Sequence, residues 1–247
     1  MTSPIRAVAD RVVGPAKRGY AAGARGVGRV LRALRLQGDE PPPRAKRWRH
    51  WAFSLTRAHD SLAIAALDVP WWTYDAIDDV DAWLSARPRP VRVFEWGSGA
   101  STIWLARRAD EVHSVEHHRG FGEHLAPSLS AFPNVSLRIV EPVSIAKPVV
   151  PSAKEGNAGL DFAAYVDAID DLDGVFDLIV IDGRAREACL RRAVGRLADD
   201  GVIVFDNTRR RRYRNAIETV PMSERRFAGL TPTLPYPDQT SILSPRR

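Results

Sequence analysis

Short apolar runs alternate with amphipathic stretches through the chain after residue 90. Runs rich in β-branched and aromatic residues predict strands over residues 91–95, 111–116, 135–140, 176–182 and 202–206. Apolar positions three and four apart predict helices between most of them, for example over 102–108 and 186–197. Two last apolar runs, near 225–228 and 240–243, leave little room for a helix and predict an antiparallel edge pair. The pattern is typical of an α/β protein with a mostly parallel, seven-stranded sheet flanked by helices.

The segment before the first strand has a helical pattern. Residues 74–86 place Ala76, Ile77, Val80 and Leu84 on one face, and Thr73 stands where a helix N-cap is expected. We expect this helix to pack on the sheet or to cover a bound ligand. The predicted organisation is an arm and linker at 1–45, a helical cap at 46–88 and a catalytic core at 89–247.

The basic charge of the chain is concentrated in the predicted arm. The net charge is +6, but residues 1–37 hold eight basic residues and one acidic residue, a net charge of +7, and the remainder is close to neutral at −1. A short amphipathic basic helix is predicted in the arm, followed by a linker at 38–43. Contact with an anionic membrane surface or with nucleic acid is one interpretation, and a solvated, partly disordered tail is the other.

Cysteine content and hydropathy bear on location. The single cysteine, Cys189, cannot form an internal disulfide, which fits a reducing compartment. No apolar run approaches the roughly 18 to 20 residues of a membrane-spanning helix, and the N-terminus lacks the apolar core of a secretory signal. We therefore expect a cytoplasmic protein, with peripheral membrane contact through the arm as a further option.

A glycine turn follows the first predicted strand of the core. Parallel α/β sheets bind ligands where strands end and the chain turns into a helix. Gly97 and Gly99 lie in such a turn, where the absence of Cβ atoms allows a sharp bend and close approach to a ligand. Ser98 lies between them, and Ser101 and Thr102 open the next helix.

Two acidic residues frame this turn and indicate the charge of its ligand. Glu95 precedes Gly97, where a carboxylate would repel a dinucleotide pyrophosphate but would suit a cation. S-adenosylmethionine carries a sulfonium and an ammonium, and its ribose hydroxyls could be bound by Glu116, which stands 19 residues after Gly97. The simpler interpretation, two unrelated strand-end charges, is less consistent with this spacing.

Four short motifs occur in order: EWGSGAST at 95–102, SVEH at 114–117, IDGR at 181–184 and DN at 206–207. In these motifs the chain resembles the class I S-adenosylmethionine-dependent methyltransferases, and more closely a bacterial branch of them, over residues 74–243. Ser101 stands where the family usually has a third glycine. The resemblance implies a Rossmann-like fold, with the turn holding the amino-acid part of the cofactor, Glu116 the ribose, and residues near Glu141 the adenine. The predicted cofactor-binding set is Glu95, Gly97, Ser98, Gly99, Ser101, Thr102, Glu116, His117 and Asp182.

Three oxygen-bearing side chains are predicted near the reacting methyl group. Asp182 ends the fourth strand of the core, and Asp206 and Asn207 end the fifth. They resemble the metal ligands of catechol-type O-methyltransferases, and carboxylate and amide oxygens suit Mg²⁺. In the alternative without metal, Asp182 closes the pocket and Asp206 and Asn207 shape a turn. Asp182 is also the best candidate for the general base, ahead of His117 and His118.

The residues predicted to contact the acceptor are basic or aromatic. Arg184 and Arg186, with the arginine run at 209–212, favour an acidic acceptor, although solvated positions are an alternative. The segment 142–174 and the residues Trp71, Trp72 and Tyr74 are expected to shape the acceptor pocket.

Together these features favour methylation of a hydroxyl group on a small molecule or glycan. A nucleic-acid methyltransferase is the first alternative, suggested by the basic arm, but the nearly neutral remainder and the absence of an N-P-P-Y-like tetrapeptide after the fourth strand make nucleic acid the less favoured partner. A non-catalytic S-adenosylmethionine-binding protein tethered by its arm is the second alternative.

Overall fold

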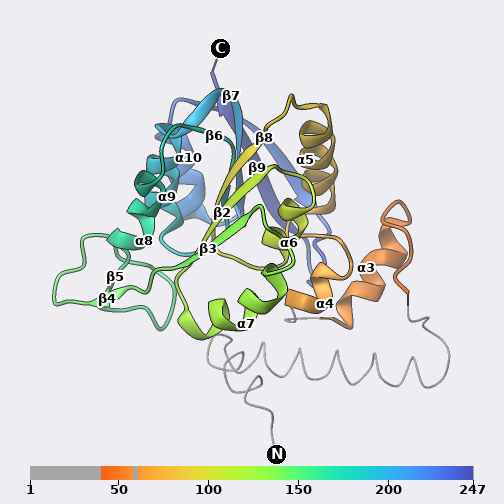
Figure 1. Ribbon diagram of the computed structural model, residues 1–247, viewed down its shortest axis with the longest axis horizontal. Coiled ribbons are helices and arrows are strands. Elements are labelled where there is room, and N and C mark those ends of the chain that lie inside the picture. Colours follow the sequence, from red (N-terminus) through yellow and green to blue (C-terminus); the bar gives the residue numbers. More distant parts are fainter. Residues whose placement is uncertain (1–39, 58–60, 247) are drawn as a thin grey trace, which may run out of the picture.

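The computed structural model describes residues 40–57 and 61–246. Their centre is a seven-stranded sheet in the order β3-β2-β1-β6-β7-β9-β8 (Figure 1). The first five strands in this order run parallel, and β9 pairs antiparallel with both β7 and β8. The predicted Rossmann-like sheet with an antiparallel edge is confirmed. The strands of the sheet are β1 (Arg92–Trp96), β2 (Glu111–Glu116), β3 (Val135–Ile139), β6 (Phe176–Ile181), β7 (Leu197–Asp206), β8 (Met222–Gly229) and β9 (Asp238–Pro245).

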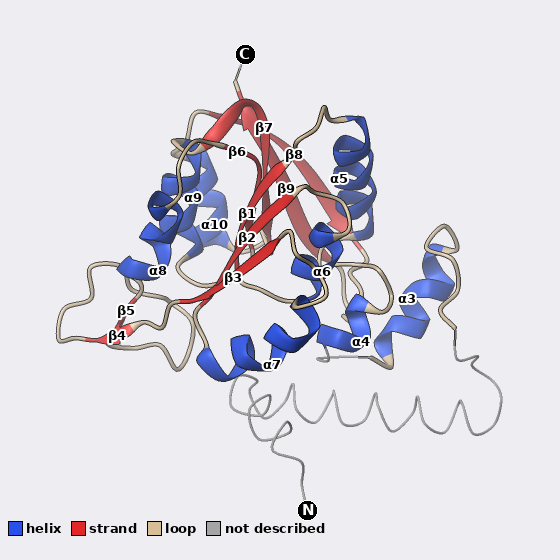
Figure 2. Cartoon of the chain, viewed as in Figure 1, coloured by secondary structure: helices blue, strands red, loops and turns tan. Residues whose placement is uncertain are grey.

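Helices cover both faces of the sheet (Figure 2). One face carries α5 (Tyr74–Ala86), α6 (Ala100–Ala106) and α7 (Arg119–Leu129), and the other carries α8 (Ala163–Asp167), α9 (Arg186–Val194) and α10 (Arg211–Glu218). Side chains of the central strands alternate between the two cores. In β6, Leu178 and Val180 pack on the first side and Ile179 and Ile181 on the second. Burial on both faces explains why this strand is a continuous apolar run.

The sequence pattern located most elements within a few residues, and the largest deviation was the start of β7, at Leu197 where the strand was predicted from residue 202. The predicted strand at 111–116 and the helix at 74–86 have the bounds of β2 and α5. The helix predicted over 186–197 ends at Val194, because Leu197 already pairs with Phe176 as the first residue of β7. A register shift between Phe176 and Leu178 accommodates the longer strand.

Thr73 connects α5 to the sheet. It occupies the N-cap position with an extended backbone, but its hydroxyl makes no capping hydrogen bond. The hydroxyl donates to the Phe227 carbonyl at 3.2 Å, and the Thr73 amide donates to Thr240 Oγ1 at 3.0 Å. Of the two expectations for this helix, packing on the sheet is confirmed.

The N-terminal cap supports the loop between β8 and β9. The cap begins with α3 (Arg47–Leu55) and α4 (Ser61–Ala65). Trp51 Nε1 donates to the Leu234 carbonyl at 2.9 Å, and Trp71 Nε1 donates to Thr233 Oγ1 at 3.0 Å. The Thr233 amide in turn donates to Ser54 Oγ at 2.9 Å. These bonds fix the loop from two directions.

A long excursion leaves the sheet after β3. It contains the two-stranded pair β4 (Val143–Ser144) and β5 (Leu160–Asp161), followed by α8 and the short 3₁₀ helix η1 (Ala168–Asp171). The Asp161 carboxylate accepts the amides of Val149, Val150 and Ala163 at 2.9 to 3.0 Å. These backbone hydrogen bonds lower the pKa of Asp161. One acidic side chain thus holds the irregular chain that leads to residues 152–155.

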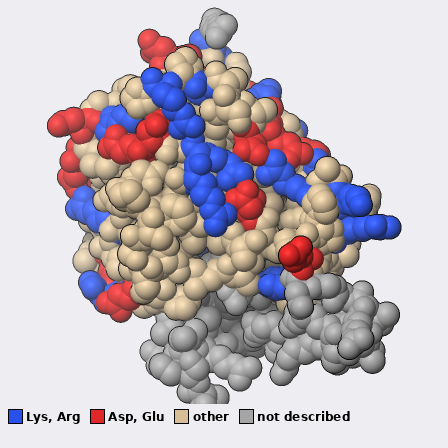
Figure 3. Space-filling model, turned by 45° about the vertical axis from the view of Figure 1, so that its right-hand side comes forward, with Lys and Arg blue, Asp and Glu red and all other residues tan. Residues whose placement is uncertain are grey.

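Charges of both signs are interspersed on the face shown in Figure 3, which includes the side with α3 and α5. Four aspartates of α5 pair with arginines from other segments: Asp75 with Arg47, Asp78 with Arg44 and Arg47, Asp79 with Arg225, and Asp81 with Arg44 and Arg108. No helix within residues 40–57 and 61–246 is long and apolar enough to cross a membrane. The predicted basic helix of the arm lies outside the described residues.

Candidate active site

A cavity of about 600 Å³ opens at the carboxyl ends of β1, β2, β6 and β7. This is the edge of the sheet where β1 lies between β2 and β6: the chain passes from β1 to β2 and β3 on one side and then crosses to β6 on the other. Ligands of doubly wound sheets bind at such a switch point. The cavity therefore lies where the sequence motifs converge.

The glycine turn forms the floor of the cavity. Gly97 has a φ of +98°, and a Cβ on this residue would lie 2.6 Å from Gly183 Cα. The Gly97 amide donates to the Val115 carbonyl and the Asp182 amide donates to the Trp96 carbonyl, both at 2.9 Å. Glycine is required here because the turn after β1 touches the turn after β6.

Glu95 lies beneath this floor and is fully buried. Its carboxylate accepts hydrogen bonds from Ser101 Oγ and Thr102 Oγ1 at 2.5 Å and from Ser114 Oγ at 2.6 Å. Two of these hydroxyls belong to α6, and Ser114 is the register partner of Glu95 on β2. Glu95 and Thr102 do not line the cavity, whereas Ser101 does. Direct contact of Glu95 with a cofactor stays a prediction, and its observed contacts bind β1, β2 and α6 together.

Burial raises the pKa of Glu95 to about 7, although the three hydroxyls oppose the shift. Because this pKa exceeds the unfolded value, the contribution of Glu95 to the free energy of unfolding is largest when the carboxyl is protonated and falls as pH rises toward 7. Between pH 5 and pH 8 the wild type should lose about 2 to 3 kcal/mol relative to Glu95→Gln, which has no such titration. Urea denaturation at both pH values measures this difference.

The control for this prediction is Glu123→Gln, which changes an exposed carboxylate on α7. Its stability relative to the wild type should be nearly independent of pH in this range. Equal pH dependence in Glu95→Gln and the wild type would show that Glu95 does not titrate near neutrality.

Glu116 reaches the cavity from the end of β2 and is almost fully buried. Its Oε1 accepts the His118 amide at 2.8 Å and lies 2.8 Å from His117 Nδ1. His118 Nδ1 accepts the Phe121 amide at 3.1 Å and so caps α7. Both histidines line the cavity, but His118 also has this structural task, while His117 packs beside Phe162 and Tyr165.

Arg186 lies between the two acidic strand ends on the opposite side of the cavity. It is almost fully buried, and its Nη2 donates to Asp182 Oδ1 at 2.6 Å while its Nη1 lies 3.9 Å from Asp206 Oδ2. Nη1 and Nη2 also donate to the carbonyls of Asp206 and Asp182, both at 2.7 Å, and Nε donates to Gly183 O at 3.1 Å. Burial raises the pKa of the Asp182 carboxyl, and Arg186 opposes that shift.

The predicted metal site does not fit this arrangement. The guanidinium of Arg186 already supplies the positive charge between Asp182 and Asp206, and Thr240 Oγ1 donates to Asp206 Oδ1 at 2.7 Å. Asn207 Nδ2 donates to Asp238 at 2.9 Å, and the Asn207 backbone has a φ of +57° in the turn before α10. Within the described chain, no group of three His, Cys, Asp or Glu side chains could hold a metal ion. The alternative in which these residues shape the pocket and a turn is the one that the geometry favours.

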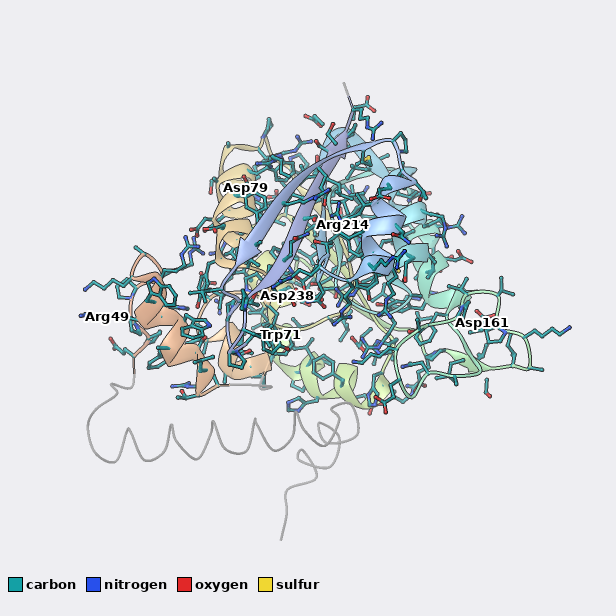
Figure 4. All side chains as sticks on the ribbon, turned by 180° about the vertical axis from the view of Figure 1, so that it is seen from behind. Arg49, Trp71, Asp79, Asp161, Arg214 and Asp238 are labelled. Carbon is teal, nitrogen blue, oxygen red and sulfur yellow. The ribbon has the colours of Figure 1, made fainter. Side chains whose placement is uncertain are left out.

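Basic and aromatic side chains line the remaining walls. Arg184, Arg210, Arg212 and Tyr213 lie on the side of α9 and α10. Trp71 and Asp238 lie close together on the opposite wall (Figure 4). Residues 152–155 complete the rim of the cavity. The rest of the segment between β3 and α8 extends away from the cavity, as the position of Asp161 shows (Figure 4).

Two residues expected in the acceptor pocket, Trp72 and Tyr74, and Glu141, near which the adenine was expected, do not line the cavity. Trp72 and Tyr74 are core residues: Trp72 packs edge-on against Trp104, and the Tyr74 hydroxyl lies 2.7 Å from His50 Nδ1. Glu141 pairs with Arg119 at 2.8 Å and does not line the cavity.

The sequence analysis also missed residues. Ser114 was not recognised as a partner of Glu95, since their pairing depends on strand register, and residues 233–238 carried no motif. Of the residues predicted to bind cofactor or metal, those that line the cavity are Gly97, Ser98, Gly99, Ser101, Glu116, His117, Asp182, Asp206 and Asn207. The predicted acceptor or base residues that line it are Trp71, His118, Arg184, Arg186, Arg210 and Arg212.

The part of the chain that forms this cavity matches a known protein family. Residues 94–208, which run from β1 to just beyond β7, match a family model described as a methyltransferase domain. Residues 94–208 are thus a methyltransferase domain, and its sheet has the class I methyltransferase fold. The match covers the strands whose ends form the cavity floor.

Solved structures of other methyltransferases share the fold. The O-methyltransferase TomG from Streptomyces achromogenes, solved in complex with SAM, is 18% identical, with a TM-score of 0.51 over 76% of this methyltransferase and 90% of TomG. A methyltransferase-like protein from Silicibacter pomeroyi is 20% identical, with a TM-score of 0.41 over 68% of this chain and 87% of that one. No curated protein sequence matches significantly.

Proposed function

We propose that this methyltransferase uses S-adenosylmethionine to methylate a hydroxyl oxygen of a small molecule or glycan. The observation that carries the proposal is the convergence of the glycine turn, Glu116 and Asp182 on one cavity at the switch point of the sheet. The size of the cavity, about 600 Å³, is within the usual range for cofactor and small-molecule sites. TomG supports the choice of oxygen as the acceptor atom, since it is an O-methyltransferase with the same fold.

The residues of the cavity fit S-adenosylmethionine chemically. The turn at 97–99 exposes backbone toward the amino-acid end of the cofactor, and Glu116 offers carboxylate oxygens to its ribose hydroxyls. When bound, the cofactor supplies a methyl group on a positively charged sulfur. Acidic groups near the floor favour that charge over an anionic nucleotide.

Asp182 is the residue that we assign as general base. Arg186 holds its Oδ1 at 2.6 Å, which fixes the carboxylate at the end of β6. Burial raises its pKa, which improves its ability to accept the proton of an acceptor hydroxyl. Methyl transfer to a hydroxyl oxygen would release the hydroxyl proton, and Asp182 would accept it.

Two measurements test the proposed function. Calorimetry with S-adenosylmethionine and S-adenosylhomocysteine should show binding of both. Incubation with cofactor labelled in its methyl group and a fractionated cell extract should then place label in the small-molecule or glycan fraction. Binding without transfer to any fraction would favour the non-catalytic alternative, and label in RNA or DNA would overturn the proposed acceptor class.

Asp182→Asn should separate binding from turnover. The amide keeps an oxygen for Arg186 but cannot accept the hydroxyl proton, so the methyl-transfer rate should fall about 100-fold. S-adenosylhomocysteine affinity should stay within about threefold of the wild type, a change of less than 1 kcal/mol. The control Asp167→Asn makes the same change in an exposed pair with Arg192 and should leave both values unaltered. An active Asp182→Asn enzyme would exclude Asp182 as the base.

A further inference from the structure

Two arginines of the turn after β6 have very different environments. Arg186 makes four hydrogen bonds to protein oxygens, including one to the Asp182 carboxylate. Arg184, two residues earlier, has one hydrogen bond from its side chain, to the Gly183 carbonyl at 3.3 Å. Its Nε is buried without a hydrogen-bond partner, and it makes no ion pair within residues 40–57 and 61–246. Arg184 nevertheless lines the cavity.

A partly buried guanidinium that makes no ion pair and has an unbonded Nε is unfavourable, although the charge of Glu116 acts on it from a distance. Desolvation and the neighbouring charge of Arg186 both lower the pKa of Arg184. Arginine remains protonated even when its pKa falls, so the unfavourable charge persists until an anion approaches. A ligand with an oxyanion would supply that charge and could bind through two parallel hydrogen bonds.

The surrounding wall adds positive charge. The ring of Tyr213 has the guanidinium carbons of Arg186, Arg210 and Arg212 at 5.6, 5.7 and 4.8 Å from its centroid. The nearby acids already have partners: Asp182 pairs with Arg186, Glu187 lies 3.5 Å from Arg212, and Glu116 accepts the His118 amide and lies 2.8 Å from His117 Nδ1. An anion at Arg184 would therefore lie on the wall of the cavity where the arginines are concentrated.

We propose that Arg184 binds a carboxylate or phosphate group of the methyl acceptor. This inference rests on the proposed function and narrows its substrate class to anionic hydroxyl compounds. Arg184 and Asp182 are two residues apart in one turn, so the anion of such a compound would be held beside the base that receives its hydroxyl proton. The carboxylate of the cofactor is a less suitable partner for Arg184, because an ammonium group accompanies it. The backbone of the glycine turn would also face that carboxylate.

The test uses inorganic phosphate and acetate as probes of the full-length protein saturated with S-adenosylhomocysteine. Phosphate or acetate should bind to the wild type, as measured by calorimetry, and Arg184→Gln should weaken that binding at least tenfold. Arg191→Gln makes the same change at an exposed position of α9 and should bind the probe like the wild type. The melting temperature of Arg184→Gln without the probe should equal or exceed that of the wild type, since the substitution removes an uncompensated charge.

Other outcomes would overturn the inference. Equal probe binding by Arg184→Gln and the wild type, or no binding by the wild type, would exclude an oxyanion site at Arg184. A tenfold loss of S-adenosylhomocysteine affinity in Arg184→Gln, with unchanged affinity for 5′-methylthioadenosine, would assign Arg184 to the cofactor carboxylate. Failure of the wild type to bind S-adenosylhomocysteine would instead refute the proposed function, and is recognised before any probe is added.

Discussion

Replacing Arg186 with methionine should destabilise the protein by about 3 to 5 kcal/mol at neutral pH, the cost expected when one partner of a buried ion pair is removed. Methionine fills a similar space but leaves Asp182 and Asp206 without their shared cation. The carbonyls of Asp182, Gly183 and Asp206 lose donors as well. Guanidinium denaturation of the wild type and of the variant measures the loss directly.

Arg192→Met on the same helix is the matched control. Arg192 pairs with Asp167 and Asp170, all three of which are exposed, so the substitution should cost less than about 1 kcal/mol. The effect of Arg186→Met should also be smaller at pH 5 than at pH 8, because protonation removes the uncompensated charge of the two aspartates. A loss as small as that of Arg192→Met would mean that Arg186 does not hold these carboxylates in place.

Gly97→Ala should abolish measurable cofactor binding and lower stability by about 2 to 4 kcal/mol through backbone strain and overpacking. Its φ of +98° disfavours any residue with a Cβ, and the new methyl group would lie 2.6 Å from Gly183 and 2.8 Å from the Asp182 carbonyl carbon. The contacts are with backbone, so a rotamer change cannot relieve them. The turns after β1 and β6 must therefore separate, which deforms the cavity floor. Calorimetry with S-adenosylhomocysteine and thermal unfolding report the two effects.

Gly156→Ala separates the two causes of this loss. Gly156 has a φ of +80°, but a Cβ there would meet nothing within 4 Å. This control should lose about 1 kcal/mol from the backbone conformation alone and should keep cofactor affinity. If Gly97→Ala lost no more than Gly156→Ala, close approach of the two turns would not be the reason for glycine at position 97.

The candidate site shows which functional residues a local sequence motif predicts and which it does not. Gly97, Ser98, Gly99 and Glu116 were predicted because a strand followed by a sharp turn must present them at one edge of the sheet. The same reasoning brought Asp182 and Asp206 together, and they do meet across the cavity. Sequence reasoning could not decide which positive group lies between the two carboxylates, because that depends on the direction of the Arg186 side chain. A metal was one of the two interpretations that the sequence left open, and the guanidinium of Arg186 lies between the two carboxylates instead.

The sequence by itself determined the strands, their approximate ends, the parallel character of the sheet and the turn beside it. Those features follow from hydrophobic periodicity and from glycine, whose effects act over a few residues. Tertiary structure alone decided the partners of buried charges. Glu95 accepts a hydrogen bond from the Ser114 hydroxyl because strand register places the two side by side. Arg186, which follows β6, donates to the Asp206 carbonyl at the end of β7, and Arg184 lines the cavity with an unbonded Nε. A charge pair in a low-dielectric interior depends on distances of a few ångströms between residues far apart in the chain, which no local pattern specifies.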